Sequence, residues 1–213
     1  MEQYRRRLPH AYANNTPVFI TWRLKFTLPI DVVKKMSLEK EKFEKSILML
    51  SEDYQNMQRY QFSKKQFDLY DDILGCNQDL PQLLTKPEIA SIIQDSFNFL
   101  DGKKYSLHAS CIMSNHVHLL LTPLVDVDKE KQAIGDISHS LKRFTAREIN
   151  KLLGKDGSLW ANESYDHLVR NEKEYVRIGW YIINNPVKAG LVDDWKQWKF
   201  TWLEDDLRQH FSS

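Results

Sequence analysis

The chain has 213 residues, and its 30 Lys and Arg nearly balance its 29 Asp and Glu, which leaves a formal net charge of +1. Hydrophobic residues make up 42% and charged residues 28%, a composition typical of a soluble globular domain rather than a disordered chain. The charge balance excludes a protein that attracts nucleic acid through its total charge, so any basic surface must come from local clustering.

Cysteine usage and hydropathy indicate the cellular compartment in which the protein is expected. The two cysteines, Cys76 and Cys111, lie in no zinc-ligand spacing, and both are expected to be reduced thiols that pack as small apolar groups. The basic N-terminus is followed by no apolar segment of the kind found in secretory signals. No segment is long and apolar enough to span a bilayer. We therefore expect a cytoplasmic protein with no membrane partner.

The first half of the chain predicts one strand followed by helices. β-Branched and aromatic residues over 18–26 are typical of a strand. Charged segments with apolar residues at helical spacing predict helices over 30–51 and 61–74. Pro87 suits the first position of a third helix, over 88–100.

The second half begins with a predicted β-hairpin. Strands over 105–113 and 116–122 are separated by Ser114-Asn115, a two-residue connection. A long amphipathic helix is predicted over 129–153, with Ile134, Ile137, Leu141 and Phe144 facing inward.

The last main helix has a clear start and stop. Asn171 can cap its N-terminus, with Glu174 completing a capping box. Pro186 disfavours a helical conformation at the residue before it, so the helix is predicted to end at Asn185. Few strands, several helices and a hairpin together predict an α+β fold built on an antiparallel sheet.

The histidine pair His116 and His118 is a candidate metal site. Alternate residues of a strand share a face, so both imidazoles can converge on one ion. Imidazole is a good ligand for divalent transition metals. Two core histidines with satisfied hydrogen bonds would show the same spacing, so the pair alone does not decide between the two interpretations.

Tyr181 and Asn185 lie four residues apart and share one face of the predicted helix. A phenol becomes a nucleophile when the phenol is activated or its target is polarised, and a metal held by the histidines would polarise a phosphate oxygen. Asn185 can offer its carbonyl oxygen as a third ligand. The simpler alternatives are an amphipathic core tyrosine and an ordinary residue at a helix end.

A cationic stripe lies on the predicted helix over 129–153. Its members recur at steps of four residues, with one further lysine beside them: His139, Arg143, Arg147, Lys151 and Lys142. Such a stripe can bind DNA phosphates, although a solvated helix face has the same pattern. Arg5, Arg6 and Arg7 form a second basic cluster. Four aromatic residues are expected near the site and could stack unpaired bases: Trp22, Trp160, Tyr165 and Trp180.

Several motifs resemble those of one enzyme family. The segment 111–121, CIMSNHVHLLL, resembles the HUH strand of the single-tyrosine transposases. The segment 159–170, LWANESYDHLVR, resembles the stretch that precedes their catalytic helix. The run YIINNPVKAGLV at 181–192 closely resembles a motif of the REP-associated tyrosine transposases. With Pro9-His10 and the segment 19–24, the resemblance covers roughly residues 4–192.

The resemblance implies a fold and a set of site residues. The fold is a ferredoxin-like or RRM-like antiparallel sheet with helices packed on it, as one domain over 1–213 with a helical insertion at about 39–82. His116 and His118 match the metal ligands, and Tyr181 matches the nucleophile. Asn185 stands where some relatives place glutamine as the third metal ligand.

The resemblance also implies an activity. The expected protein is a metal-dependent single-stranded DNA endonuclease and strand transferase, a transposase that forms a 5′-phosphotyrosine intermediate. Its cofactor would be Mg or Mn. Its partner would be single-stranded or hairpin DNA from repetitive extragenic palindromic (REP) elements. The protein itself would be associated with the nucleoid and could form a homodimer. Two alternatives stay open: a domesticated, catalytically inactive DNA-binding protein, and a metal-dependent phosphoesterase that activates water.

Overall fold

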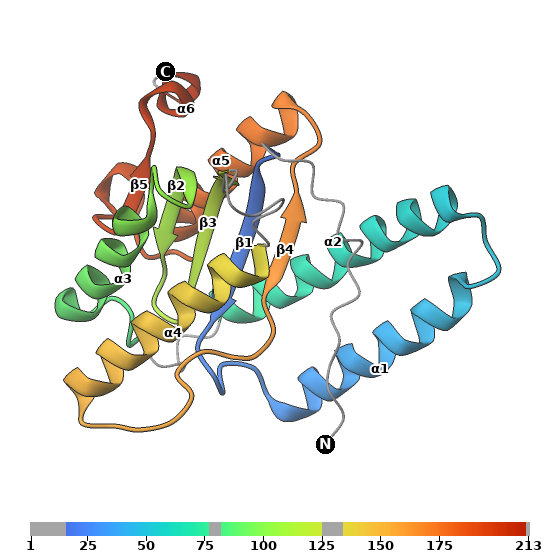
Figure 1. The fold of residues 1–213 in the computed structure, drawn as a ribbon, viewed down its shortest axis with the longest axis horizontal. Coiled ribbons are helices and arrows are strands. Elements are labelled where there is room, and N and C mark those ends of the chain that lie inside the picture. Colours follow the sequence, from blue (N-terminus) through green and yellow to red (C-terminus); the bar gives the residue numbers. More distant parts are fainter. Residues whose placement is uncertain (1–15, 77–81, 125–133, 212–213) are drawn as a thin grey trace.

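The structure, a computed structural model, describes residues 16–76, 82–124 and 134–211 (Figure 1). The strands in these ranges are β1 (Val18–Arg23), β2 (Tyr105–Ile112), β3 (His116–Pro123), β4 (Tyr165–Leu168) and β5 (Thr201–Leu203). The α-helices are α1 (Ile30–Ile47), α2 (Glu52–Cys76), α3 (Pro87–Leu100), α4 (Ile134–Leu153), α5 (Glu172–Lys188) and α6 (Asp205–Arg208). Short 3-10 helices cover Trp195–Gln197 and Gln209–Phe211.

The strands form one antiparallel sheet in the order β4-β1-β3-β2-β5. The hairpin of β2 and β3 has the predicted connection, and the Met113 N–H donates to the His116 carbonyl at 2.9 Å. The predicted α+β fold on an antiparallel sheet is confirmed. The first strand is shorter than predicted: β1 ends at Arg23, and Phe26 has a positive φ of 67°, which is incompatible with a continuing strand.

Helices cover both faces of the sheet (Figure 1). On one face, alternate strand residues such as Ile20 and Leu119 pack in a core with α3 and α4. On the other, residues such as Phe19 and Leu120 pack with α2, α5 and α6. One expected core residue is misplaced: Phe144 of α4 is 44% exposed and lies beneath the Arg147 guanidinium. It lies three residues beyond Leu141, at the border of the apolar stripe.

Two long helices, α1 and α2, form a hairpin that projects from the sheet (Figure 1). Phe43 and Phe62 stack between them, with ring centroids 4.1 Å apart. Helix α2 reaches the sheet from Tyr60 onward: Tyr60 packs against His167 of β4, and Phe67 is buried against Phe19 of β1. The helix predicted over 61–74 begins earlier, at Glu52, because its first turns lie mostly in solvent and carry no apolar stripe to reveal them.

Helix α5 begins as predicted and ends later. The Asn171 side chain accepts a hydrogen bond from the Glu174 N–H, while the Glu174 carboxylate accepts from the Arg170 N–H at 2.9 Å. The predicted end at Asn185 is wrong, because α5 continues through Pro186 to Lys188. A proline in the last turn removes only one intrahelical hydrogen bond, and the helix closes with the Ala189 N–H on the Asn185 carbonyl at 2.9 Å.

Candidate metal and tyrosine site

His116 and His118 lie on the face of β3 that α2 and α5 cover. Both are buried, with 1% and 0% of their surface exposed, and their Nε2 atoms are 3.1 Å apart. The His116 Nδ1 contacts the Asn115 Oδ1, and the His118 Nδ1 is 2.8 Å from the Thr21 hydroxyl. Both outer nitrogens can therefore donate to oxygen atoms, which leaves the two Nε2 lone pairs directed at the same point.

The electrostatics of this pair favour neutral rings. Burial lowers the pKa of His116 well below its usual value, and the neighbouring His118 lowers it further. Burial likewise lowers the pKa of His118 to about 4, against the opposing charge of Asp71. Both imidazoles are thus neutral at pH 7, which is the form that binds a metal.

Asp71, from α2, is the third member of the group. One oxygen of its carboxylate lies 3.7 Å from the His118 Nε2, and the other accepts from the Lys188 Nζ at 3.0 Å. Among the described residues, candidate ligand atoms of Asp71, His116 and His118 all lie within 4.8 Å of one another. Burial opposes ionisation of Asp71. The neighbouring His118 and the hydrogen bond from Lys188 act against burial, and the pKa of Asp71 is lowered.

This donor set fits a divalent metal ion. The buried Asp71 Oδ1 has no hydrogen-bond partner in the described structure, and two imidazole lone pairs face the same space. Two nitrogens and one carboxylate oxygen suit Mn²⁺ and other transition metals better than Mg²⁺, which prefers oxygen ligands. Asp71 was missed by the sequence analysis, since it lies in the segment that was interpreted as an insertion.

Tyr181 and Asn185 approach the histidines from α5. The Tyr181 ring packs edge-on against His118, with centroids 5.5 Å apart, and against Phe67 of α2 at 5.8 Å. Neither the Tyr181 hydroxyl nor the Asn185 Nδ2 has a hydrogen-bond partner among the described residues, although both are buried. Burial raises the pKa of Tyr181, and the negative charge of Asp71 raises it further. The phenol is therefore protonated until a cation or a base changes this environment.

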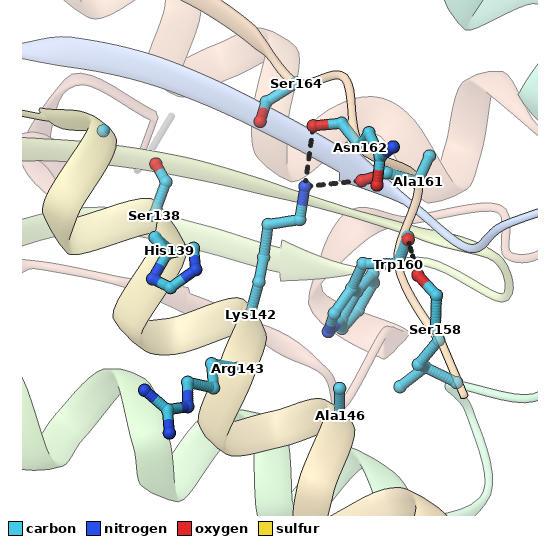
Figure 2. A pocket seen from close by; sticks show the side chains of 12 residues that line it. Ser138, His139, Lys142, Arg143, Ala146, Ser158, Trp160, Ala161, Asn162 and Ser164 are labelled. Carbon is cyan, nitrogen blue, oxygen red and sulfur yellow. Dashed lines mark hydrogen bonds between the residues drawn. The ribbon is translucent and has the colours of Figure 1, made fainter. Parts of the chain in front are cut away.

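The predicted DNA-binding residues lie on the opposite face of the sheet. A cavity of about 380 Å³ separates α4 from the segment 158–164, and His139, Lys142 and Arg143 line it (Figure 2). Lys142 holds that segment, because its Nζ donates to the Ala161 carbonyl at 2.6 Å.

The stripe continues along α4 beyond the cavity. The Arg147 guanidinium donates to Glu148 at 2.8 Å, and Lys151 is exposed at the end of the helix. The stripe thus exists as a surface, but it does not adjoin Tyr181. The cluster Arg5, Arg6 and Arg7 lies outside the described residues.

The aromatic residues expected near the site are divided between the faces. Tyr165 stacks on Phe67 with centroids 4.1 Å apart and belongs to the surroundings of Tyr181. Trp22 and Trp160 pack against each other on the opposite face, so the expectation for them is wrong. Side chains of adjacent strand positions point to opposite faces, and Trp22 is one position out of phase with Thr21 and Arg23.

The antiparallel sheet carries paired histidines on its central strand, and a tyrosine on a helix lies against them, which is the arrangement that the resemblance to the single-tyrosine transposases implies. No protein-family model matches the sequence. A Haemophilus influenzae protein described as a REP-associated tyrosine transposase is 27% identical over 105 residues, which are 47% of this chain and 60% of that protein. The chain thus matches about three fifths of that relative's length.

One solved structure shares the fold, and a second shows a weaker similarity. A REP-associated tyrosine transposase bound to a REP hairpin superposes with a TM-score of 0.57 at 17% identity, over 100% of this chain and 89% of the other. A Deinococcus radiodurans R1 protein described as a transposase matches at a TM-score of 0.39 and 16% identity, over 87% and 98% of the two chains. The chain is accordingly similar to one REP-associated tyrosine transposase over part of its sequence and to another in its fold.

Proposed function

We propose that the chain is a transposase that cuts and rejoins single-stranded DNA through Tyr181. The observation that carries this proposal is the burial of the Tyr181 hydroxyl beside the His118 ring and the Asp71 carboxylate. The Tyr181 oxygen would bond to phosphorus while the bond from phosphorus to the 3′-oxygen breaks. The phenolic proton ends on that 3′-hydroxyl, and the 5′-phosphate stays on the tyrosine.

His116, His118 and Asp71 would hold the divalent cofactor, with Asn185 as a further oxygen donor from α5. When bound, the cation withdraws electrons from a phosphate oxygen and stabilises the charge that develops there. The nitrogen-rich donor set supports Mn²⁺ over Mg²⁺. Neutral histidines and an ionised Asp71 at pH 7 support metal binding without prior loss of protons.

The substrate would be single-stranded DNA beside a hairpin. A REP hairpin is bound in the solved structure that shares this fold. An unpaired strand also avoids the cost of unstacking and unpairing, roughly a few kcal/mol. The stripe His139, Lys142, Arg143, Arg147 and Lys151 would contact phosphates away from the cleavage point. A homodimer, a cytoplasmic location and association with the nucleoid belong to the same proposal. No helix in the described ranges is long and apolar enough to cross a membrane.

The polarity of the covalent adduct tests the proposal. Hairpin-flanked single-stranded oligonucleotides, labelled at the 3′ end, are incubated with protein and Mn²⁺ and separated under denaturing conditions. A 5′-phosphotyrosine link transfers the 3′ label to the protein, whereas a 5′ label stays on the released strand. Tyr181→Phe should form no adduct, and Tyr175→Phe, on the same helix, should retain it.

The alternatives give different results. Cleavage without any adduct would indicate attack by water and thus a phosphoesterase. Binding of the hairpin with neither cleavage nor adduct, in Mn²⁺ and in Mg²⁺, would indicate a DNA-binding protein that has lost catalysis. An adduct that persists in Tyr181→Phe would exclude Tyr181 as the nucleophile.

A further inference from the structure

Arg23 is a buried cation beside the candidate site. It is the last residue of β1 and pairs directly with His116 of β3, so both side chains leave the sheet on the same face. Arg23 is 5% exposed. Arg23 thus occupies the strand position opposite His116, and Thr21 occupies the position opposite His118.

The partners of Arg23 are too few for a buried charge. One guanidinium nitrogen donates to the Leu24 carbonyl at 3.3 Å, and another lies 3.6 Å from the Glu163 carboxylate. The Arg23 Nε is buried with no hydrogen-bond partner in the described structure. A guanidinium has five donors, and a buried charge that lacks partners destabilises the fold. The arrangement is understandable if a ligand completes it.

A second donor without a partner lies at the same place. Tyr70 of α2 has a buried hydroxyl with no hydrogen-bond partner among the described residues, and its ring centroid is 5.8 Å from the Arg23 guanidinium carbon. A tyrosine hydroxyl carries one hydrogen that it can donate to a ligand. Two donors from different elements thus face one small region.

Holding the neighbouring segment does not require the Arg23 side chain. Backbone hydrogen bonds already attach the segment 158–164 to the end of β1: the Lys25 N–H donates to the Leu159 carbonyl at 2.8 Å, and the Ala161 N–H donates to the Arg23 carbonyl at 3.0 Å. The Glu163 side chain is 57% exposed, so its contact with Arg23 is open to solvent. An ion pair of this length, with one partner open to solvent, contributes little stability.

We propose that Arg23 binds a backbone phosphate of the DNA strand beside His116, with the Tyr70 hydroxyl as a second donor. The inference deepens the function proposed above and rests on it. Guanidinium groups recognise phosphate oxygens through paired donors, and this is stronger than a contact with one long-range carboxylate. The Glu163 carboxylate pairs with Arg23 while DNA is absent, and the phosphate displaces that carboxylate when DNA binds. Arg23 is thereby a phosphate-binding residue of the cleavage site, on the opposite face of the sheet from the stripe of α4.

The test compares substitutions with opposite expected signs. Affinity for a single-stranded oligonucleotide is measured by fluorescence anisotropy across a salt series, with Tyr181→Phe present in every variant to prevent cleavage. Arg23→Gln should weaken binding by roughly 10- to 100-fold, since it removes charge-assisted hydrogen bonds. The same change should reduce the log–log salt slope by about 0.7. Tyr70→Phe should weaken binding by roughly 2- to 10-fold.

Glu163→Gln distinguishes phosphate binding by Arg23 from stabilisation of the fold by the ion pair of Arg23 and Glu163. If Glu163 competes with phosphate, its neutralisation tightens binding by roughly 2- to 5-fold. If the ion pair only braces the fold, Glu163→Gln weakens binding as Arg23→Gln does, and that result overturns the inference. Arg59→Gln is the matched control, because it also removes a cation paired with one glutamate, Glu44 at 3.1 Å. Arg59 lies about 16 Å from Tyr70 along the axis of α2. It should bind like the parent protein.

Two further readouts keep the outcomes distinct. Thermal unfolding followed by circular dichroism shows whether Arg23→Gln is folded; if it is not, Glu163→Gln and Tyr70→Phe decide alone. Adduct formation by the protein with Tyr181 intact tests the proposed function separately. A protein that forms the adduct but whose Arg23→Gln variant binds and cleaves normally would refute the role of Arg23 and leave the proposed function standing.

Discussion

The two faces of the sheet differ in the residues that the same strands place on them. Alternate residues of β1 and β3 that face α3 and α4 are apolar, as with Ile20 and Leu121, and are completely buried. The residues between them, which face α2 and α5, include Thr21, Arg23 and His118. Buried atoms without a hydrogen-bond partner follow the same division among the described residues. The face of α2 and α5 holds Arg23 Nε, Tyr70 Oη, Asp71 Oδ1, Tyr181 Oη and Asn185 Nδ2, whereas the other holds Trp22 Nε1. One further atom, Gln66 Oε1, lies on α2 where that helix pairs with α1.

The difference shows how one sheet can hold a site whose buried polar groups lower the stability of the fold. Buried polar groups without partners destabilise a fold and persist only where the surrounding structure outweighs them. Apolar packing on both faces supplies that excess of stability, and the core with α3 and α4 does not touch the groups that would do chemistry. Substitutions on the two faces should therefore separate stability from function.

The largest effect on stability is expected on the apolar face. Leu119→Ala removes a fully buried side chain from the core with α3 and α4. The free energy of unfolding should fall by about 2–5 kcal/mol, from lost burial and the cavity left behind. Urea unfolding measures the loss, and Mn²⁺ affinity at low temperature should be unchanged in the folded variant. A large loss of metal affinity there would show that the two faces are not independent.

The largest effect on metal binding is expected on the polar face. Asp71→Asn keeps the shape of the side chain and removes its charge, so Mn²⁺ affinity should fall by more than roughly tenfold. Titration calorimetry measures the change. Asp72→Asn is the matched control, because Asp72 is adjacent, exposed, and also paired with Lys188, at 2.9 Å. Equal losses in both variants would mean that charge near Lys188 matters and ligation by Asp71 does not.

Acid should lower the free energy of unfolding through the buried histidines of the polar face. The folded pKa of His118 is about 4, while an unfolded histidine titrates near 6.5. Between these values the unfolded chain binds protons that the folded chain does not, so stability falls as pH drops from about 6.5 toward 4. His116, with its pKa lowered for the same reason, acts in the same direction. Each contributes at most about 1.4 kcal/mol per pH unit.

Metal-free protein is needed to see this dependence. Urea unfolding in chelator at several pH values between 7.5 and 4.5 gives the slope of stability against pH. His118→Gln should flatten the slope, and His210→Gln, at an exposed position, should leave it unchanged. A slope that is the same in all three proteins would contradict the assignment of buried neutral histidines.

The smallest effect is expected on the cationic stripe of α4. Arg143→Ala with Arg147→Ala should reduce the log–log salt slope of DNA binding by about 1.4 for a single strand, at roughly 0.7 per phosphate contact. Lys34→Ala with Lys35→Ala, on the exposed surface of α1, removes the same charge and should leave the slope unchanged. Equal slopes in both double variants and the parent would show that the α4 stripe is merely solvated.

The parts of the site that could be predicted from sequence are those set by local spacing. His116 and His118 share a face because they are two residues apart on a strand, and Tyr181 and Asn185 share one because they are four apart on a helix. Asp71 could not be found this way. It resembles its exposed neighbour Asp72, and only the path of α2 across the sheet buries one of them.

The fold shows the same division between local and distant information. The hairpin of β2 and β3 and the start of α5 were predicted from turn and capping residues. Pro186 misled because a local steric preference gave way to the packing of α5, in which Asn185 and Pro186 are both buried. The first turns of α2 were missed because a helix in solvent on most sides has no apolar period.

The origin of Asp71 on the α1–α2 hairpin has a consequence for the nascent chain. The histidines, Asp71 and Tyr181 come from three segments that lie far apart in the sequence, and only long-range contacts bring them together. A ribosome-bound or partly folded chain therefore lacks the grouping, even where β2 and β3 have already paired. The proposed activity would thus be tied to completion of the fold, because Asp71 reaches the histidines only when α2 has packed on the sheet.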